Sequence, residues 1–340
     1  MERKLQRYNI VKIQRVEYPI RKIKRIEEVM KSGKLFTKKF CDCILSMTQT
    51  EDKRFACGNL YGTISISSYD LETKTWKIDM EKEELHNDGV YSLCALNGNR
   101  LLSGGMDSLI KVWSISDVDM TLIKEIKEHT EQVWKIIPLS KQRFASCSDD
   151  KTIKIWKDDN TYQCISTLRH DDSVQSILQL RGKEVLVSTY DESQLIGVSF
   201  WNINDNTCIH SIKGYGRYYY FISMIELYNG NLAHFSYDYE FFPPLIIITD
   251  TSSYQIVTII KLKGELMDTR AILFAFDEHS FIYLNNGWFL QKSNEDCSIV
   301  CRLGGKIFDC FNRGIFPIEG GKYFAVENGS RISIIKLQYD

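Results

Sequence analysis

Residues 86–113 read HNDGVYSLCALNGNRLLSGGMDSLIKVW, and residues 129–156 read HTEQVWKIIPLSKQRFASCSDDKTIKIW. In both stretches a His is followed by a Ser after 17 residues, by an Asp after 21 and by a Trp after 27. The two copies start 43 residues apart, and apolar residues recur at matching places in both. A fixed period of this length is typical of repeat architectures.

Each copy predicts a small antiparallel sheet. Four short runs alternate apolar and polar residues, and turn pairs such as Asn97-Gly98 and Asp149-Asp150 separate them. This pattern favours a four-stranded meander joined by tight turns. Such a sheet cannot bury both of its faces alone, so it must stack against further copies of itself.

The polar residues at fixed spacing predict a hydrogen-bonded set inside each sheet, which we call a staple. The carboxylate can accept from the imidazole, the other imidazole nitrogen can meet the hydroxyl, and the hydroxyl can accept from the indole. The two staples comprise His86, Ser103, Asp107 and Trp113, and His129, Ser146, Asp150 and Trp156. Ser, His and Asp also suggest acyl transfer, but a buried Ser bonded to Trp has no access to substrate. We therefore expect a structural role.

These residues resemble the WD40-repeat β-propellers of the G-protein β-subunit type. The His of the family's Gly-His opening is present, although Leu85 and Glu128 stand where the family has Gly. The Trp of its Trp-Asp close is also present, followed here by Ser114 and Lys157. The resemblance implies a ring of four-stranded blades, and about seven blades of this length would use most of the 340 residues.

The flanking repeats are less regular. The first blade, placed at Ile44 to Ser67, has Tyr61 at the Asp position and lacks the staple. The fourth blade follows His170, and we expect Val187 to replace its staple Ser. Trp201 comes ten residues after Asp191 instead of six, which predicts a turn that bulges outward.

Strand rhythm alone predicts blades five to seven. The last blade has only three strands, at 314–318, 323–327 and 331–337, and residues about 33–39 are expected to supply its fourth. The predicted fold is therefore all-β, a seven-bladed WD40 β-propeller of four-stranded antiparallel blades whose last blade is closed by an N-terminal strand. The predicted division is a basic N-terminal arm at 1–32 and a propeller at 33–340.

The start of the chain differs in charge from the rest. Residues 1–40 carry thirteen Lys or Arg and four Glu, whereas the whole chain has a net charge of −1. Apolar residues at three- or four-residue steps from Ile10 to Met30 favour an amphipathic helix interrupted at Pro19. An arm packed on the propeller and an arm that binds a partner or phosphate both stay open. Contact of this arm with nucleic acid or an anionic membrane stays open as well.

Composition excludes some classes of protein. No apolar run approaches the roughly 20 residues of a membrane span, and the first residues lack a signal-peptide core. We therefore expect a cytoplasmic protein, with the nucleus as the alternative. The ten cysteines include no C-x-x-C pair, and no His stands near the close pairs at ligand spacing. We expect reduced thiols and neither a metal site nor a cofactor.

The resemblance also implies a docking surface, at the end of the blades that bears the turns between second and third strands. The residues assigned to this surface are Tyr91, Met106, Trp134, Asp149, Gln175, Tyr190, Tyr220 and Tyr237. Tyr and Trp dominate the energetics of many protein interfaces. The alternative is that these aromatic residues only pack between blades.

The function expected from these features is a non-catalytic scaffold or adaptor that binds a partner protein or peptide, with no small-molecule substrate. A substrate-recognition subunit of a ubiquitin ligase is the alternative, although the family's Trp-Asp-x-Arg signature is absent after the three Trp residues. A propeller enzyme is less favoured, because His210, His234 and His279 fall in different blades. A phosphoinositide box is matched only in part, by Phe311-Asn-Arg-Gly314.

Overall fold

The computed structural model describes residues 13–14, 34–39, 43–73, 75–192, 195–217, 223–236, 245–261, 271–275, 280–285, 288–293, 299–303, 315–318, 323–328 and 331–336. Every regular element in these ranges is a β-strand. None of these ranges holds a helix that is long and apolar enough to span a lipid bilayer.

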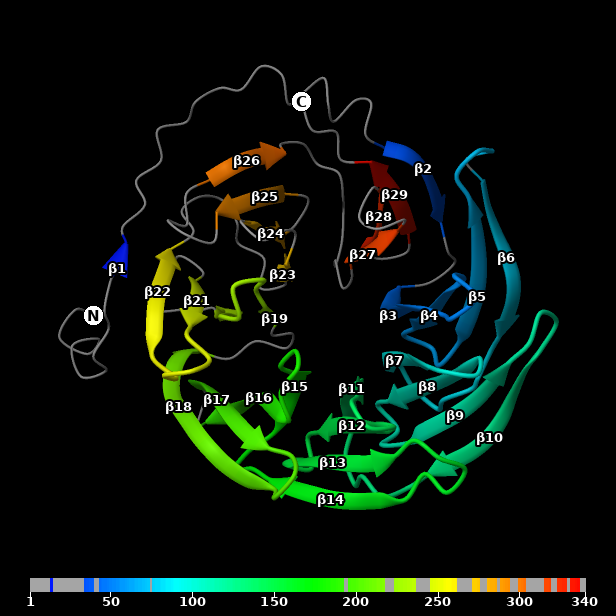
Figure 1. The fold of residues 1–340 in the computed structure, drawn as a ribbon. Helices are drawn as coiled ribbons and strands as arrows, with labels where there is room; N and C mark the ends of the chain where they lie inside the picture. Colours follow the sequence, from blue (N-terminus) through cyan, green and yellow to red (C-terminus); the bar gives the residue numbers. More distant parts are fainter. Residues whose placement is uncertain are drawn as a thin grey trace. The chain divides into compact units, whose positions relative to one another are not determined.

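The chain divides into two compact units, which are described separately. Figure 1 labels the strands of both units in sequence order. Unit 1 comprises Met1–Met30, Leu178–Ile203 and Thr207–Asn312. Unit 2 comprises Lys31–Ile177, Asn204–Asn206 and Arg313–Asp340.

Three meanders of unit 2 contain the repeats found in the sequence, and all their strand pairs are antiparallel. The first runs through β3 (Ile44–Gln49), β4 (Phe55–Asn59), β5 (Ile64–Asp70) and β6 (Thr75–Lys82). The second runs through β7 (Val90–Leu96), β8 (Arg100–Gly105), β9 (Ile110–Ile115) and β10 (Met120–Ile126). The third runs through β11 (Val133–Leu139), β12 (Arg143–Ser148), β13 (Thr152–Lys157) and β14 (Cys164–Arg169).

The hairpin turns form because particular residues adopt left-handed backbone conformations. Gly98 and Asn99, between β7 and β8, have φ of 74° and 53°. Two successive positive φ values suit the turns whose twist matches that of paired strands, and Asn and Gly accept them readily. Lys141 and Gln142 adopt φ of 60° and 52° at the corresponding turn between β11 and β12.

The meanders of unit 2 stack through their first two strands. β7 lies against β3 and β4 on one side and against β11 on the other. Gly58 and Gly104, in the second strands, permit this approach: a Cβ at Gly58 would lie 2.7 Å from the Val90 side chain, and one at Gly104 would lie 2.8 Å from that of Val133. Larger residues at these glycines would push neighbouring sheets apart.

Hydrogen bonds between sheets recur at one position of the first strand. Ser46 Oγ donates to the carbonyl of Val90 at 2.7 Å, and Ser92 Oγ accepts from the amide of Ile136 at 2.8 Å. Lys135 occupies the corresponding position in β11, and its Nζ donates to Ser176 Oγ at 3.1 Å. These bonds pair polar groups that the stacking of sheets would otherwise bury without partners.

The fourth meander contains β15 (Val174–Gln179), β16 (Val185–Glu192), β17 (Leu195–Asn202) and β18 (Thr207–Arg217). The predicted outward bulge between Asp191 and Trp201 is wrong. The inserted residues lengthen the hairpin instead, since Asp191 pairs with Ile196 and Glu192 with Leu195. Continued pairing satisfies backbone groups that a loose loop would leave to solvent.

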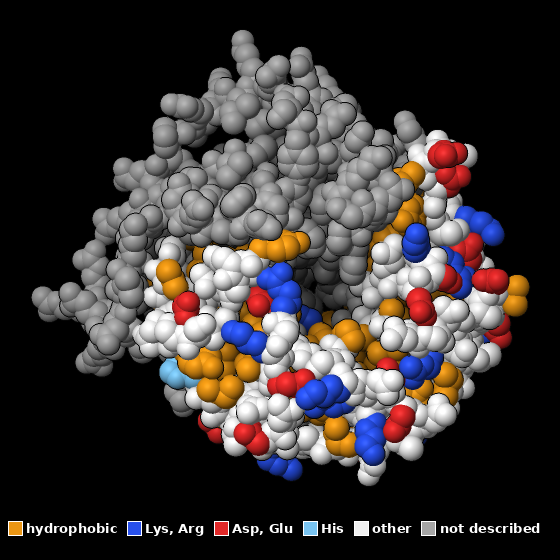
Figure 2. All heavy atoms as spheres, viewed as in Figure 1, with side chains coloured by type: hydrophobic (Ala, Val, Ile, Leu, Met, Phe, Trp, Pro, Cys, Tyr) orange, Lys and Arg blue, Asp and Glu red, His pale blue; other side chains and the backbone are white. Residues whose placement is uncertain are grey.

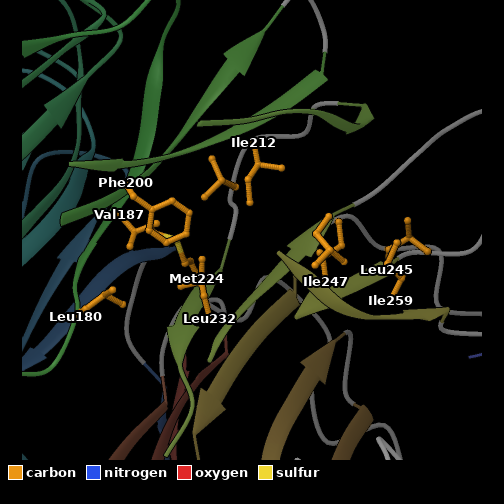
Figure 3. Packing of buried hydrophobic residues seen from close by; sticks show 11 residues of the cluster. Leu180, Val187, Phe200, Ile212, Met224, Leu232, Leu245, Ile247 and Ile259 are labelled. Atoms are coloured by element: carbon orange, nitrogen blue, oxygen red, sulfur yellow. The ribbon is translucent and has the colours of Figure 1, made fainter. Parts of the chain in front are cut away.

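Unit 1 holds two further meanders. One runs through β19 (Met224–Glu226), β20 (Leu232–Ser236), β21 (Leu245–Thr249) and β22 (Ile256–Lys261), and the other through β23 (Ala271–Ala275), β24 (Ser280–Asn285), β25 (Trp288–Ser293) and β26 (Ile299–Leu303). Buried residues from β16 to β22, including Val187, Phe200 and Ile247, form a hydrophobic cluster (Figure 3). Removal of these side chains from water stabilises the packing of adjacent sheets.

The helix expected over residues 10–30 is wrong at Ile13 and Gln14. These residues form β1, which pairs in parallel with the outer edge of β22, Ile13 opposite Ile259 and Gln14 opposite Ile260. The unpaired edge of β22 offers backbone donors and acceptors, and this edge pairing prevails over the helical spacing at these two residues. The rest of the predicted helix lies outside the described residues.

The predicted N-terminal closing strand is confirmed. β2 (Lys34–Lys39) pairs antiparallel with β29 (Arg331–Lys336), so that the sheet order is β2, β29, β28 (Tyr323–Asn328) and β27 (Ile315–Ile318). The all-β class and its four-stranded antiparallel building block are therefore confirmed. The number of blades and the division at residues 32 and 33 stay predictions.

His234 is a buried basic residue in β20. It lies opposite Met224 and Ile247 on the neighbouring strands and is 1% exposed. Burial lowers the pKa of His234 to about 4, from an ordinary value of 6.5. His234 is therefore neutral in the folded chain at neutral pH.

The unfolding free energy should fall between about pH 6.5 and pH 4, because the unfolded chain binds a proton at His234 in this window and the folded chain does not. The contribution of His234 to this loss should be about 2 kcal/mol between pH 7.5 and pH 5. Urea unfolding of the wild type and of His234→Gln at both pH values measures it. The wild type should lose more stability than the variant, and equal losses would contradict the buried neutral imidazole.

Candidate functional site

The four residues of the first staple are linked inside the second meander. His86 Nδ1 lies 2.9 Å from Asp107 Oδ1, and His86 Nε2 lies 2.7 Å from Ser103 Oγ. Trp113 Nε1 donates to the same Ser103 hydroxyl at 2.8 Å. Because a carboxylate only accepts, the bond between His86 and Asp107 uses a proton on Nδ1.

The third meander repeats this arrangement. His129 Nδ1 lies 2.6 Å from Asp150 Oδ2, and Ser146 Oγ lies 2.7 Å from His129 Nε2 and 2.9 Å from Trp156 Nε1. Burial raises the pKa of Asp150, but hydrogen bonds from His129 and Thr152 outweigh burial and bring the pKa to about 2. The carboxylate therefore stays ionised and keeps its bond to the imidazole at neutral pH.

The geometry of the two staples does not suit nucleophilic catalysis. Ser103 and Ser146 are fully buried. Each hydroxyl is engaged by both an imidazole and an indole. A nucleophilic hydroxyl needs free space next to its oxygen for the carbon atom that it attacks. The imidazole and the indole occupy that space in both staples.

The fourth meander has its staple Ser one residue later than predicted. Trp201 Nε1 donates to Ser188 Oγ at 3.3 Å, so Val187 does not occupy the staple position. Ser188 comes fourteen residues after the start of β15, whereas the staple Ser comes thirteen residues after the start of β7 and of β11. The connection between β15 and β16 is longer than its counterparts, and this shifts the spacing from His170. Aligning Leu186-Val-Ser with Phe144-Ala-Ser, instead of counting from the His, would have found Ser188.

The turns between second and third strands lie at the same end of the unit 2 meanders as the connections into first strands. The Met106 amide donates to the Gly89 carbonyl at 3.0 Å, and the Asp149 amide donates to the Gln132 carbonyl at 3.1 Å. A third bond runs in the opposite direction, from the amide of His170 in a connection to the carbonyl of Lys151 in a turn, at 2.9 Å. Turns and connections of unit 2 therefore form one continuous end, called the turn end below.

Apolar side chains gather at this turn end. Tyr61 is 65% exposed, Met106 is 42% exposed and Leu60 is 38% exposed. Tyr91 and Trp134 are half-buried and pack edge to face, with ring centroids 4.9 Å apart. We call these five residues the turn patch.

Gly89 lies close to three members of the turn patch, which are Leu60, Tyr91 and Met106. A Cβ at Gly89 would lie 3.1 Å from the Tyr91 ring and 3.4 Å from the Leu60 carbonyl, and Met106 bonds to the Gly89 carbonyl. In the described part of the chain, Figure 2 also shows hydrophobic side chains reaching the surface between charged ones.

Leu60 and Tyr61 were not among the residues assigned from the sequence. Tyr61 stands where Asp107 and Asp150 stand in the next repeats, and Leu60 stands where Met106 stands. With no staple His to bind, the side chain at the Asp position can point to solvent. The substitution of Asp by Tyr at this turn was the signal that could have identified it.

Asp149, assigned to the docking surface, is engaged within the chain. Its Oδ1 accepts from Trp134 Nε1 at 2.5 Å and from Ser173 Oγ, and its Oδ2 accepts from Gln132 Nε2. These donors come from β11 and from the connections on either side of the third meander. Asp149 therefore anchors Trp134 and is not available to a partner.

Two further assigned residues are buried in the described structure. Tyr190 is 4% exposed, and its ring lies over Gly197, where an added Cβ would approach to 2.4 Å. Gln175 is 8% exposed. Tyr220 and Tyr237 lie outside the described residues. Tyr91, Met106 and Trp134 are thus the assigned residues that the structure brings together with an accessible surface.

The part of the chain that the structure describes holds no group of three or more His, Cys, Asp or Glu side chains placed to bind a metal ion. His210 stacks on Tyr254, with ring centroids 5.2 Å apart. His234 is buried in β20.

Comparison with known proteins places the repeats in a family. Residues 82–114 and 120–157 match the family described as WD domain, G-beta repeat. The first match covers β7, β8 and nearly all of β9, and the second covers β10 to β13, so both staples lie within the matches.

Relatives are found among fungal proteins. The ubiquitin homeostasis protein lub1 of Schizosaccharomyces pombe is 34% identical over 107 residues, which are 31% of this chain and 14% of the relative. The nuclear distribution protein nudF 1 of Talaromyces marneffei is 31% identical over 121 residues, covering 34% of this chain and 25% of the relative. The nuclear distribution protein PAC1 of Gibberella zeae is 30% identical over 128 residues, which are 34% of this chain and 26% of the relative.

The similarity thus spans about a quarter or less of each of these relatives. The repeat match, the two staples and the four-stranded antiparallel meanders agree on the family. Residues 82–114 and 120–157 are WD40 repeats.

Proposed function

We propose that the chain is a non-catalytic interaction scaffold whose partner protein or peptide docks on the turn patch. The observation that carries this proposal is the exposure of Tyr61, Met106 and Leu60 at the same end of the meanders as the packed rings of Tyr91 and Trp134. Exposed apolar groups gathered in one place mark interaction sites more often than single ones do.

The composition of the turn patch supports a protein partner. Tyr, Trp and Met are enriched at protein interfaces, and Tyr and Trp supply many of the residues that dominate binding energy. Trp134 is held by Asp149 and by the Tyr91 ring, so little of its side-chain freedom is left to lose on binding. A prearranged aromatic pair therefore favours a specific contact.

The staples support a scaffold over an enzyme. Each Ser, His and Asp set is closed by an indole N–H, and both sets lie inside a packed sheet. A polar network that is satisfied in this way positions the strands and their turns. The Ser and His side chains of both staples therefore serve the structure of the sheet.

No specific observation favours the ubiquitin-ligase alternative. One relative is named for ubiquitin homeostasis, but two others of similar identity are named for nuclear distribution. Trp113 and Trp156 are followed by Ser-Ile-Ser and Lys-Asp-Asp, which lack the Arg of the ligase-docking signature. The cytoplasmic location and the role of the basic residues 1–32 likewise stay proposals.

Affinity capture with two double variants tests the turn patch. Tyr61→Ala combined with Met106→Ala should weaken capture of the main partner at least about tenfold, since one hot-spot side chain contributes roughly 2 kcal/mol. The control is Leu122→Ala combined with Ile123→Ala, which removes apolar residues that are 49% and 48% exposed on the outer strand β10. The control should capture normally, and both variants should melt like the wild type. Loss of capture with the control alone would move the docking surface to β10.

A further inference from the structure

We infer that the partner segment at the turn end is an extended basic peptide whose main chain pairs with the side-chain amide of Gln175. This inference rests on the proposed function and adds the chemistry of the partner. It combines an unsatisfied buried amide, the charge of the connections and the apolar turn patch.

The side-chain amide of Gln175 lacks hydrogen-bond partners in the part of the folded chain that the structure describes. Both its Nε2 and its Oε1 are buried and have no hydrogen-bond partner among the described residues. Gln132 shows a similar gap, since its Nε2 donates to Asp149 while its Oε1 is buried without a partner. Buried polar groups in folded proteins are nearly always paired, so an unpaired donor and acceptor on one amide suggest a missing partner.

Gln175 occupies in β15 the position that two turn-patch residues occupy in the preceding meanders. Tyr91, Trp134 and Gln175 are each the second residue of the first strand in successive meanders. The flanking residue Ser173 donates to Asp149, which also holds Trp134, and Ser176 accepts from Lys135 of β11. Residues before and after Gln175 in the sequence are thus hydrogen-bonded to the third meander, which carries Trp134.

A main-chain partner suits the Gln175 amide better than a side chain does. In an extended peptide the N–H and C=O of one residue point to the same side, and a primary amide can meet both at once. Main-chain recognition of this kind gives affinity, while the alternate side chains of the peptide give specificity. Because the amide is buried in the unbound chain, binding requires a side-chain movement at this edge.

The charge of the turn end selects a basic peptide. The connections into β7, β11 and β15 carry a strong excess of carboxylates, most of them exposed: Glu83, Glu84, Asp88, Glu128, Glu131, Asp171 and Asp172. Lys127 is engaged by Glu125 at 2.8 Å, outside this set, whereas Lys151 lies 3.7 Å from Asp172 and offsets one of these carboxylates. Complementary charge speeds encounter and rejects acidic partners.

The apolar turn patch sets the remaining requirement. An extended peptide projects successive side chains to opposite sides, so one apolar residue can rest on the turn patch while its neighbours reach the carboxylates. The segment expected to bind is therefore an apolar residue flanked by Lys or Arg.

A library of displayed random twelve-residue peptides, selected on the full chain, tests this inference. The selected peptides should be enriched in Lys or Arg around an apolar residue. Their affinity should fall as salt rises and should fall several-fold in the combined variant Asp88→Asn, Glu131→Gln and Asp171→Asn. Selection of acidic or uncharged peptides would overturn the inference but would not contradict docking of a partner on the turn patch.

The variant Gln175→Leu tests the main-chain pairing with a synthetic copy of the best peptide. The Leu side chain removes the unpaired amide and should leave the melting temperature equal or higher, while affinity falls about tenfold. Methylation of one peptide nitrogen at a time should identify a position where wild type loses affinity and Gln175→Leu does not. If no such position exists, or if Gln175→Leu binds like wild type, Gln175 is only a core residue. If the Tyr61 and Met106 double variant also keeps all binding, the proposed function fails as well.

Discussion

Replacement of Trp156 by Ala should lower the unfolding free energy by about 3–5 kcal/mol. Trp156 is fully buried, its ring stacks on Phe144 with centroids 5.9 Å apart, and its indole N–H donates to Ser146. The substitution removes a large part of the cluster that joins the second and third meanders and also opens the second staple. Urea unfolding monitored by circular dichroism measures the loss.

Two matched variants separate packing from hydrogen bonding at this position. Trp156→Phe keeps an aromatic ring on Phe144 but removes the N–H donor to Ser146, so its cost should be smaller, about 1–3 kcal/mol. Trp134→Phe, at the half-buried turn patch, should lower the unfolding free energy by less than Trp156→Ala or Trp156→Phe does. If Trp156→Ala and Trp134→Phe unfolded at the same urea concentration, the assignment of Trp156 to the core would be wrong.

Removal of residues 1–40 should abolish the single cooperative unfolding transition. This deletion takes away β2, which pairs with β29 from Lys34 opposite Ile335 to Lys39 opposite Arg331. The backbone donors and acceptors on this edge of β29 then face solvent without a strand, and such an edge also invites aggregation. Calorimetry and light scattering measure the two consequences.

Removal of residues 1–28 is the control for this deletion. It eliminates β1 and most of the basic residues of the N-terminal arm but leaves β2 in place. Because β1 contributes only two residues to the edge of β22, this shorter variant should unfold cooperatively near the wild-type temperature. Identical melting of both deletions would show that the β2 and β29 pairing contributes little to stability.

Local pattern predicted the strands well because each repeat carries its own turn residues and its own alternation. The strands expected at 323–327 and 331–337 correspond to β28 and β29, and the closing strand expected at about 33–39 corresponds to β2. The placement of β2 could be predicted although β29 is far away in sequence, because a three-stranded last repeat leaves an unpaired edge.

Counting residues from an anchor failed where a connection changed its length. The position of Ser188 depends on its register with Trp201 across β16 and β17, and the longer connection between β15 and β16 does not alter that register. The extension of the β16 and β17 hairpin escaped prediction for a related reason. Extra residues can bulge or keep pairing, and only the twist and surroundings of the strands decide which.

The accessibility of the predicted surface residues was beyond sequence reasoning. Asp149 was expected at the surface, but its three donors come from Gln132, Trp134 and Ser173, which the chain brings together only after the sheets stack. Tyr190 was expected to project, but Gly197 on the paired strand leaves space that its ring fills. Residue type indicates what a side chain can bind, and neighbours decide what it does bind.

The sequence by itself determined the four-stranded repeat, the staple residues of the second and third meanders and the strand that pairs with β29. These features depend on alternation, turn chemistry and fixed spacing, all of which act within one repeat or at its edge. Only the tertiary structure decided that Tyr61 and Met106 are exposed while Tyr190 and Gln175 are buried. Exposure depends on how neighbouring sheets and turns pack, and no spacing within a single repeat encodes those contacts.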